Sequence, residues 1–528
     1  MRPLGLLFLG FLGAWIGCSG AGPDLVAPSE PAPARPRDPN VVTTAEGDVR
    51  GSVDGETRVF KAIPFAAPPV GELRWRPPAP VTPWQGVRDG GSFSSACTQL
   101  DPRGVRTIGS EDCLYLNVWA PRAATSEPLP VLFWMHGGDN VIGSATEPSY
   151  DARQLAEGAR AVVITINYRL GAFGFLAHPA FARENEHGST GNYAVLDAIA
   201  ALQWVQRNVA AFGGDPARVL VFGQSAGASN TCALVGSPLA KGLFSRAMML
   251  SLACHILAPG VVASTNASVE RHLGCEGAAD VAACLRSQSA RDVARLPGAS
   301  LVASEVPADY YETIDGWVLP DHPETTMSRG KHNEVPMILG TTRDEYQSVI
   351  DLMLAKPVET EAELREIVTR WFGARAANAL LPLYPFASYA SGRDALVAIV
   401  SDHAMHCPTR RAARAAVRGQ RAPVFRYLFS QVPTAGAGAA YGAAHGLDVD
   451  YVFRTFRSVT PTPEDLAFAE ALVATIGRFA ATGDPGDARW PRYDLATDPY
   501  VVLRSSPEIA HGLRAKACDL WDEIAPDS

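Results

Sequence analysis

The sequence predicts an α/β fold in which a large, mostly parallel central sheet is covered by helices on both faces. The 528 residues are 47% hydrophobic and only 19% charged, which is enough to bury a large core. Apolar runs of strand length recur before turn residues, with stretches of helical spacing between them. Uninterrupted apolar strands that alternate with helices are typical of parallel sheets covered on both faces.

Residues 1–18 predict an export signal. Arg2 is followed by an apolar run from Leu4 to Ile16 and then by small residues, which is the pattern of a secretory signal. The run is shorter than the roughly 20 residues that span a bilayer. The ending at Cys18 resembles a bacterial lipobox, although Trp15 occupies the usual leucine position. We therefore expect a lipidated Cys18, with an ordinary cleaved signal as the alternative.

Residues 19–40 form a predicted linker, and residues 41–528 a single domain. The linker carries six prolines and little apolar content, so it predicts an extended spacer of the kind that a membrane tether needs. From residue 41 onward the sequence contains no long low-complexity linker and no internal repeat. The expected location is the bacterial cell envelope, as a lipoprotein, or the exterior after secretion.

Strands and one long helix can be placed within the domain. The helix is predicted over Asn192–Phe212, where apolar residues recur at helical spacing, and Gly213–Pro216 ends it. The strand-like apolar runs are Val131–Met135, Ala161–Ile166, Val219–Phe222, Val335–Leu339 and Val424–Phe429.

The most informative motif follows the third of these runs. Gly223-Gln-Ser225-Ala-Gly227 lies between a predicted strand and a predicted helix, which is the context of a nucleophile elbow. The glycines relieve crowding at a strained turn, and the helix N-terminus favours developing negative charge. The alternative is an ordinary glycine-serine turn. A nucleophilic Ser225 would need a base that is oriented by an acid.

Several long motifs, in the same order, resemble the type-B carboxylesterases of the cholinesterase-like α/β-hydrolase superfamily. The resemblance runs from about Thr44 to Trp521 and implies an α/β-hydrolase fold and hydrolysis of carboxylic esters through an acyl-enzyme. Besides the elbow, the motifs that carry it are Ser110–Trp119, Asn167–Leu176 and the run from Gly191 to Pro216.

The resemblance implies the partners of Ser225. Glu345 follows a strand ending in Gly-Thr, at the position of the family's acid, and the adjacent Asp344 is its rival. His445 lies in a glycine-flanked loop after Val424–Phe429 and is the expected base. The chain order Ser, Glu, His is the order expected for this fold.

The expected oxyanion hole uses the backbone N–H groups of Gly138, Asp139 and Ala226. Two residues depart from the family pattern: Asp139 replaces a glycine, and Gln224 replaces a common Glu before the nucleophile. These departures leave a second hypothesis, a catalytically weak or inactive cholinesterase-like binding or adhesion module. We expect Asp139 to slow neutral esters unless its carboxylate points away, pairs with an Arg or binds a cationic substrate.

The cysteines agree with export. Without Cys18 an even number of eight remains, for which spacing alone allows 105 pairings. The resemblance implies three bridges, Cys97–Cys113, Cys275–Cys284 and Cys407–Cys518. It leaves Cys232 and Cys254 either as a fourth bridge or as buried thiols. It also suggests structural ion pairs, Arg74 with Glu111 and Arg169 with Asp197.

Charge and composition limit the kinds of molecule that the protein is expected to bind. A net charge of −9 and a pI near 5.7 argue against nucleic acid. The cysteine and histidine spacing gives no reason to expect a metal, and no cofactor is expected. The loop Thr98–Asp112 contains no aromatic residue, which argues against a quaternary-ammonium site there. Small-molecule esters are the expected substrates, and the oligomeric state stays open. Residues that could line a substrate pocket, or belong to the core, are Tyr310, Tyr311, Trp317 and Tyr346.

Overall fold

The computed structural model describes residues 38–122, 127–259, 268–298, 310–354 and 356–524. The predicted signal, Cys18 and the linker up to residue 37 lie outside this part. The chain separates into two units, Met1–Asp38 and Pro39–Ser528, and the fold described below is that of the second unit.

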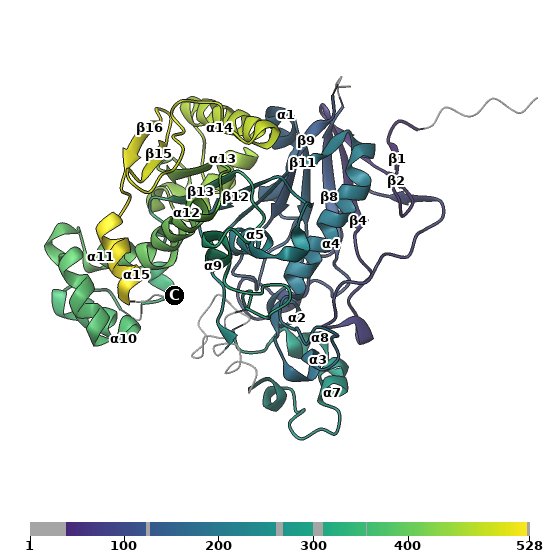
Figure 1. The fold of residues 1–528 in the computed structure, drawn as a ribbon, viewed down its shortest axis with the longest axis horizontal. Coiled ribbons are helices and arrows are strands. Elements are labelled where there is room, and N and C mark those ends of the chain that lie inside the picture. Colours follow the sequence, from purple (N-terminus) through teal and green to yellow (C-terminus); the bar gives the residue numbers. More distant parts are fainter. Residues whose placement is uncertain (1–37, 123–126, 260–267, 299–309, 355, 525–528) are drawn as a thin grey trace, which may run out of the picture. The chain divides into compact units, whose positions relative to one another are not determined.

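A mostly parallel sheet organises this unit (Figure 1). Within the described residues its eleven strands have the order β16-β15-β14-β13-β12-β11-β9-β10-β8-β4-β3. In this order, neighbouring strands from β15 through β10 pair in parallel. The strands on either side of this central part, β16 on one side and β8, β4 and β3 on the other, pair antiparallel with their neighbours. The parallel strands are β9 (Leu129–Met135), β10 (Val162–Ile166), β11 (Gly214–Gln224), β12 (Arg246–Leu250), β13 (Met337–Thr342), β14 (Val424–Phe429) and β15 (Pro499–Leu503). The antiparallel strands are β3 (Ser52–Asp54), β4 (Thr57–Pro64), β8 (Tyr115–Pro121) and β16 (Glu508–His511).

The two faces of the sheet bury separate core layers. Along β9, Val131 and Phe133 pack into one layer, and Leu132 and Trp134 pack into the other. This alternation is what a strand covered on both faces requires. The first layer includes α4 (Tyr193–Asn208), α5 (Ala226–Gly236) and α12 (Cys407–Gly419). The second includes α1 (Arg153–Ala159), α13 (Leu447–Phe453) and α14 (Pro463–Thr482).

The elements predicted from the sequence are present. Each predicted apolar run overlaps a strand, and the predicted mostly parallel sheet covered by helices is confirmed. The helix predicted over Asn192–Phe212 is α4, followed by a 3₁₀ turn at Val209–Phe212. Gly213 then adopts a φ of 89°, a conformation that favours glycine, and the chain turns into β11.

The remaining elements are short or peripheral. The helices are α2 (Gly171–Phe175), α3 (Pro179–Ala182), α7 (Val281–Ser287), α8 (Ala290–Val293), α9 (Pro323–Ser328), α10 (Glu361–Leu380), α11 (Gly392–Ser401) and α15 (Ala515–Ile524). The strands are β1 (Val41–Thr43), β2 (Asp48–Arg50), β5 (Val87–Asp89), β6 (Gln99–Leu100) and β7 (Thr107–Ile108).

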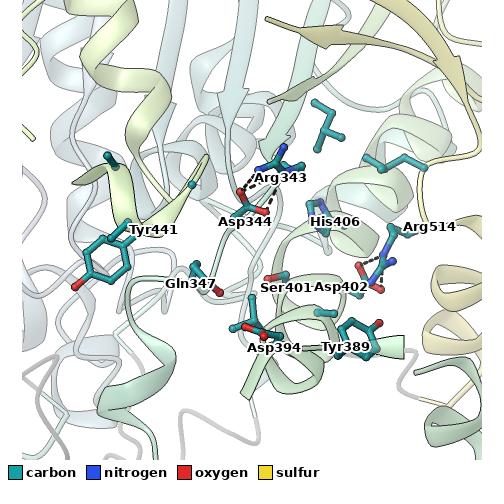
Figure 2. Close-up of a pocket in the computed structure, with 17 residues that line it drawn as sticks. Arg343, Asp344, Gln347, Tyr389, Asp394, Ser401, Asp402, His406, Tyr441 and Arg514 are labelled. Atoms are coloured by element: carbon teal, nitrogen blue, oxygen red, sulfur yellow. Dashed lines mark hydrogen bonds and ion pairs between the residues drawn. The ribbon is translucent and has the colours of Figure 1, made fainter. Parts of the chain in front are cut away.

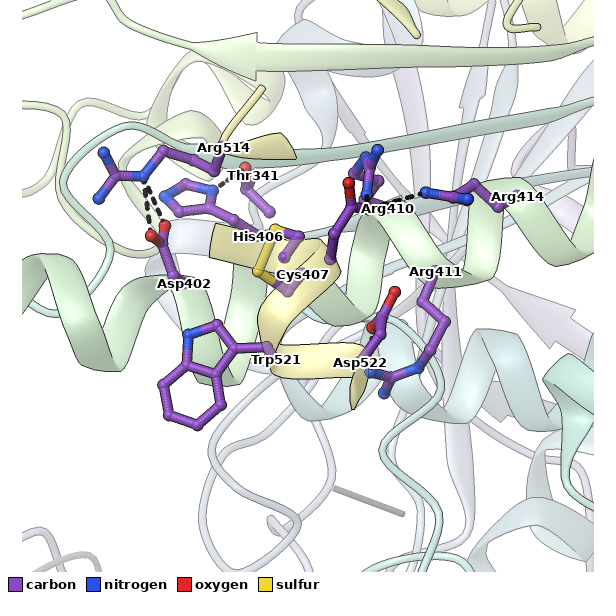
Figure 3. Close-up of a disulfide and its surroundings, with 12 residues drawn as sticks. Thr341, Asp402, His406, Cys407, Arg410, Arg411, Arg414, Arg514, Trp521 and Asp522 are labelled. Atoms are coloured by element: carbon purple, nitrogen blue, oxygen red, sulfur yellow. Dashed lines mark hydrogen bonds and ion pairs between the residues drawn. A yellow bond between two sulfur atoms is a disulfide. The ribbon is translucent and has the colours of Figure 1, made fainter. Parts of the chain in front are cut away.

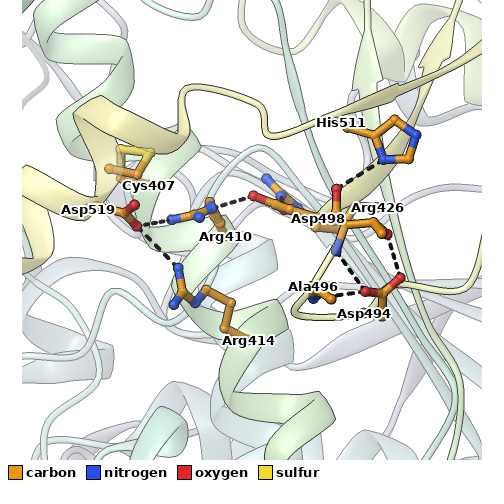
Figure 4. Close-up of polar contacts among 11 residues, drawn as sticks. Cys407, Arg410, Arg414, Arg426, Asp494, Ala496, Asp498, His511 and Asp519 are labelled. Carbon is orange, nitrogen blue, oxygen red and sulfur yellow. Dashed lines mark hydrogen bonds and ion pairs between the residues drawn. A yellow bond between two sulfur atoms is a disulfide. The ribbon is translucent and has the colours of Figure 1, made fainter.

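Helix α15 is attached to α12 by covalent and ionic contacts. Cys407, the first residue of α12, is bridged to Cys518 of α15 (Figure 3). Arg410 then bonds Asp519 of α15 at 2.7 Å and Asp498 at 2.6 Å (Figure 4). Between α11 and α12 the chain forms a π-helical turn. Such turns are frequent near functional sites.

Four disulfides lie in the described part of the chain, at Cys97–Cys113, Cys232–Cys254, Cys275–Cys284 and Cys407–Cys518. The second is the pair that the sequence left open. Disulfides of this number indicate an oxidising compartment outside the cytosol. In the described ranges, no helix has the length and hydropathy of a membrane span. The expected ion pairs Arg74–Glu111 and Arg169–Asp197 are also present.

Candidate active site

Ser225 occupies a strained turn between β11 and α5. Its φ of 56° and ψ of −127° belong to a sparsely populated region that is costly for a residue with a Cβ. The flanking glycines make this turn possible. A Cβ at Gly223 would lie 2.3 Å from the carbonyl oxygen of Gly227, and one at Gly227 would lie 2.1 Å from that of Met135. The G-x-S-x-G spacing therefore follows from close packing of the backbone.

The loop after β9 packs against this turn. A Cβ at Gly137 would lie 3.1 Å from the Cβ of Ser225, so the loop and the serine are in contact. Gly138 and Asp139 follow with φ values of 110° and 56°. No hydrogen bond among the described residues uses the N–H of Gly138, Asp139 or Ala226. These three N–H groups therefore have no hydrogen-bond partner among the described residues.

Glu345 and His445 meet in a hydrogen-bonded pair. Glu345 follows β13, His445 lies in the loop between β14 and α13, and Nδ1 of His445 is 2.5 Å from Oε2 of Glu345. Glu345 is fully buried, and its Oε1 accepts a 2.7 Å bond from the N–H of Thr342. The rival Asp344 instead accepts bonds from Arg343 and from the N–H of Ala443. The structure thus brings Glu345, and not Asp344, to the histidine.

The pair shifts both pKa values in the direction that favours charge. Burial alone would raise the pKa of Glu345, but His445, together with smaller effects of His406 and Ser251, lowers it. Burial would likewise lower the pKa of His445, and the carboxylates of Glu345, Asp448 and Asp139 together raise it. An imidazole oriented and stabilised in this way suits a general base.

The other ring nitrogen of His445 contacts Gln224. Its Nε2 lies 3.0 Å from Nε2 of the Gln224 amide. In the neutral imidazole Nδ1 donates to Glu345, so Nε2 is the acceptor and the Gln224 amide donates to it. Within the described residues no hydrogen bond joins the Ser225 hydroxyl to His445. The Gln224 amide therefore occupies the lone pair that a serine proton would need.

An apolar cluster borders the serine. Tyr311 belongs to it, and Tyr346 packs at its edge, whereas Tyr310 lies in the main core and Trp317 stacks on His187. The hydroxyl of Tyr311 donates a hydrogen bond to Oδ1 of Asp139. The cluster consists of Ala226, Leu252, Leu257, Tyr311 and Met405.

Two buried carboxyl groups near the site were missed by the sequence analysis. Asp448 accepts a 3.0 Å bond from the hydroxyl of Tyr427, and Glu312 accepts a 2.8 Å bond from Ser229 of α5. Burial raises the pKa of each to about 7. Asp448 lies three residues after His445, on the first turn of α13, and this spacing was a usable signal. No local pattern marks Glu312.

A cavity of about 590 Å³ lies beside the loop that follows β13 and carries Glu345 (Figure 2). It is lined by Asp344 and Gln347 of this loop, by His406 of the π-helical turn and by Tyr441. His406 bonds the hydroxyl of Thr341 on β13 at 2.8 Å. Ser225 does not line this cavity, so the cavity is separate from the turn that bears the serine. Among the described residues, no group of His, Cys, Asp and Glu side chains is suited to hold a metal ion.

The sheet, the strained strand-turn-helix serine and the Glu–His pair define the class of α/β-hydrolases. The family model of the carboxylesterase family matches residues 38–521, and the chain belongs to that family. It is a carboxylic ester hydrolase of the serine type that acts on small-molecule esters.

Known relatives agree with this membership. The fumonisin B1 esterase of Sphingopyxis macrogoltabida is 36% identical, with 89% of this chain and 88% of that protein covered. The cocaine esterase of Oryctolagus cuniculus is 33% identical, with 92% and 95% covered. A solved structure of a PNB esterase superposes with a TM-score of 0.78 at 31% identity, covering 91% of this chain and 99% of that one.

Proposed function

We propose that Ser225 is the nucleophile, His445 its general base and Glu345 the acid that orients the base. The observation that carries this assignment is the 2.5 Å contact of Glu345 with His445, next to a serine in a strained elbow. Ser225 attacks the ester carbonyl while Nε2 of His445 takes its proton. The imidazolium then protonates the leaving alcohol, and an acyl-enzyme remains that water hydrolyses by the same steps.

The oxyanion would be held by the N–H groups of Gly138, Asp139 and Ala226. Donors fixed before the reaction stabilise the developing charge without reorganisation, and one donor contributes about 3–4 kcal/mol in a comparable enzyme. In this proposal the Gln224 amide leaves Nε2 of His445 when substrate binds and the Ser225 hydroxyl takes its place. Catalytic contacts commonly tighten only in the substrate complex.

The triad assignment is tested with Ser225→Ala and His445→Ala on a short-chain p-nitrophenyl ester. Each change should lower kcat by several powers of ten and leave the melting temperature nearly unchanged, because the triad acts as a unit. Near-normal turnover by either folded variant would contradict the assignment of that residue to the triad.

The choice of acid is tested with a matched pair of variants. Glu345→Gln should severely impair turnover, because an amide cannot stabilise the imidazolium. Asp344→Asn should have a much smaller effect, since Asp344 bonds Arg343 and a backbone N–H. The reverse ranking of the two variants would reject Glu345.

For the layout of the chain we propose a lipoprotein signal over residues 1–18, a tether over 19–40 and the hydrolase domain over 41–528. The support is the sequence pattern around Cys18 and the disulfides of the domain. Mass spectrometry of the native N-terminus should find an acylated Cys18. A mature chain that starts after Cys18 would favour a secreted protein without a lipid.

A further inference from the structure

Asp139 places a carboxylate at the edge of the oxyanion loop. Its φ of 56° is unfavourable for a residue with a Cβ, although Asp tolerates it better than most. Asp139 is exposed, and the hydroxyl of Tyr311 donates to its Oδ1. The side chain is therefore turned toward Tyr311 and held there.

The charge of this carboxylate has no cationic partner in the described part of the chain. No Lys or Arg there forms an ion pair with Asp139, and its Oδ2 has no described hydrogen bond. His445 is close enough for Asp139 to raise its pKa, after the larger effects of burial, Glu345 and Asp448. The carboxylate thus acts on the reaction centre itself.

The sign of this charge selects among substrates. During attack by Ser225 the carbonyl oxygen becomes an anion beside the N–H of Asp139, and two like charges repel. A neutral ester has nothing to offset that repulsion. An ammonium group of the substrate next to Asp139 attracts both the carboxylate of Asp139 and the oxyanion, and it thereby offsets the repulsion between them.

The surroundings of Asp139 suit an ammonium group that is attached to an apolar substrate. Tyr311 joins the apolar cluster that borders Ser225, and Tyr346 packs at its edge. Aromatic faces attract cations, and apolar contacts hold the rest of such a ligand. The exposed carboxylate therefore lies between this apolar cluster, which borders the nucleophile, and solvent.

We propose that Asp139 makes this enzyme selective for esters that carry a protonated amine close to the ester group. The proposal rests on the hydrolase function of Ser225 and names the substrate class for that site. The recognising group is a carboxylate on the oxyanion loop, and the disulfide loop Thr98–Asp112 supplies no aromatic platform for it.

The test uses isosteric substrate pairs that differ in charge alone. For an amine in the alcohol, 2-(dimethylamino)ethyl butyrate is compared with 3-methylbutyl butyrate. For an amine in the acyl group, ethyl 4-(dimethylamino)butanoate is compared with ethyl 5-methylhexanoate. The measured quantity is the ratio of kcat/KM for the charged ester to that for the neutral ester. Because both esters use the same His445, a change in its pKa cancels in the ratio.

In the unchanged enzyme we expect a ratio of about 10 for at least one pair of esters. The reason is that the carboxylate of Asp139 attracts the ammonium group, which only the charged ester carries. The isosteric variant Asp139→Asn should lower this ratio at least about fivefold, and added salt should lower it in the unchanged enzyme alone. As the matched control, Asp54→Asn removes an exposed carboxylate from β3 at the far edge of the sheet and should leave the ratio unchanged.

Equal ratios in the unchanged enzyme and in Asp139→Asn, for both pairs, would overturn the proposal. Ser225→Ala, assayed in parallel, separates this failure from a failure of the proposed function. If Ser225→Ala is inactive while Asp139→Asn keeps the same ratios, only the substrate class is wrong. If Ser225→Ala retains turnover, the assignment of Ser225 as the nucleophile is wrong.

Discussion

Gln224 is the hydrogen-bond partner of Nε2 of His445, the ring nitrogen that faces away from Glu345. Its amide donates to Nε2 of His445, where a carboxylate would instead stabilise the imidazolium. Gln224→Glu should therefore raise the pKa of His445 and move the acidic limb of the kcat/KM profile about 1 pH unit upward. Gln224→Ala, which adds no charge, is the control. An unmoved limb in Gln224→Glu would show that this side chain does not act on the base.

Asp139 should also limit the rate on neutral esters. At about 5–6 Å and an effective dielectric constant near 20, its charge opposes the oxyanion by about 3 kcal/mol, and exposure reduces this. Asp139→Gly should then raise kcat on p-nitrophenyl acetate about three- to tenfold, and glycine suits the φ of 56°.

Asp139→Asn separates charge from backbone conformation in this prediction. If charge is the cause, the Asn variant should recover most of the gain that Asp139→Gly gives. An unchanged or lower kcat in a folded Asp139→Gly variant would refute the prediction.

Single contacts at this site depend on segments far apart in the sequence. The sequence motifs predicted Glu345 and His445 as partners of Ser225, and the structure places these two side chains in contact. The hydrogen bond from Tyr311 to Asp139 joins residues 172 positions apart, and that from Gln224 to His445 spans 221. Neither bond has a local pattern, because tertiary packing alone brings these side chains together.

At the scale of elements, apolar runs and turn residues predicted helix α4 and the parallel strands β9, β10, β11, β13 and β14, but not the central strand β12. The strands β9 and β10 are continuous apolar runs because both faces are covered. Strands β3 and β4 at the edge were not predicted. They are short or carry polar residues such as Arg58 and Lys61, so only the pairing of β4 with β8 and of β3 with β4 defines them.

The bridge between α12 and α15 should contribute more stability than the shortest bridge. Cys407–Cys518 closes a loop of 111 residues and Cys275–Cys284 one of 9. The chain-entropy relation gives about 5 and about 2.5 kcal/mol for loops of these lengths. Replacing Cys407 and Cys518 together by Ala should thus lower the melting temperature more than the same change at Cys275 and Cys284. An equal or reversed ranking would show that the ion pairs of Figure 4 hold α15 without the bridge.

For the whole molecule, two sets of buried groups make stability depend on pH in opposite ways. The carboxyls with a raised pKa bind protons more tightly in the folded state, so stability falls as pH rises from about 4.5 to 7. The histidines with a lowered pKa are neutral when folded, so stability rises between about pH 4 and 6.5. The carboxyls at about 7 are Glu312, Glu324 and Asp448. The histidines at about 4 are His136, His322 and His403.

We therefore expect the melting temperature to be nearly constant from about pH 4.5 to 6.5 and to fall above that range. Glu312→Gln removes one of the carboxyls, and its stability relative to the unchanged protein should increase by roughly 2–3 kcal/mol between pH 5 and 8. Thermal unfolding across this range measures the difference. Glu186→Gln, at a side chain that is 87% exposed, is the control. A difference that does not vary with pH would contradict the role of Glu312.

The long bridge also sets the order in which parts of this chain must be present before the bridge can form. Cys407 can form its bridge only when Cys518, 111 residues further along the chain, is present. The segment between these two cysteines contains β14, His445 and β15. In the export that we propose for this chain, all of these elements cross the membrane before the bridge can form. The residue before Cys407 is His406, which bonds the strand that leads to Glu345. The Cys407–Cys518 bridge can therefore form only late in the maturation of the chain, after both Glu345 and His445 are present outside the cytosol.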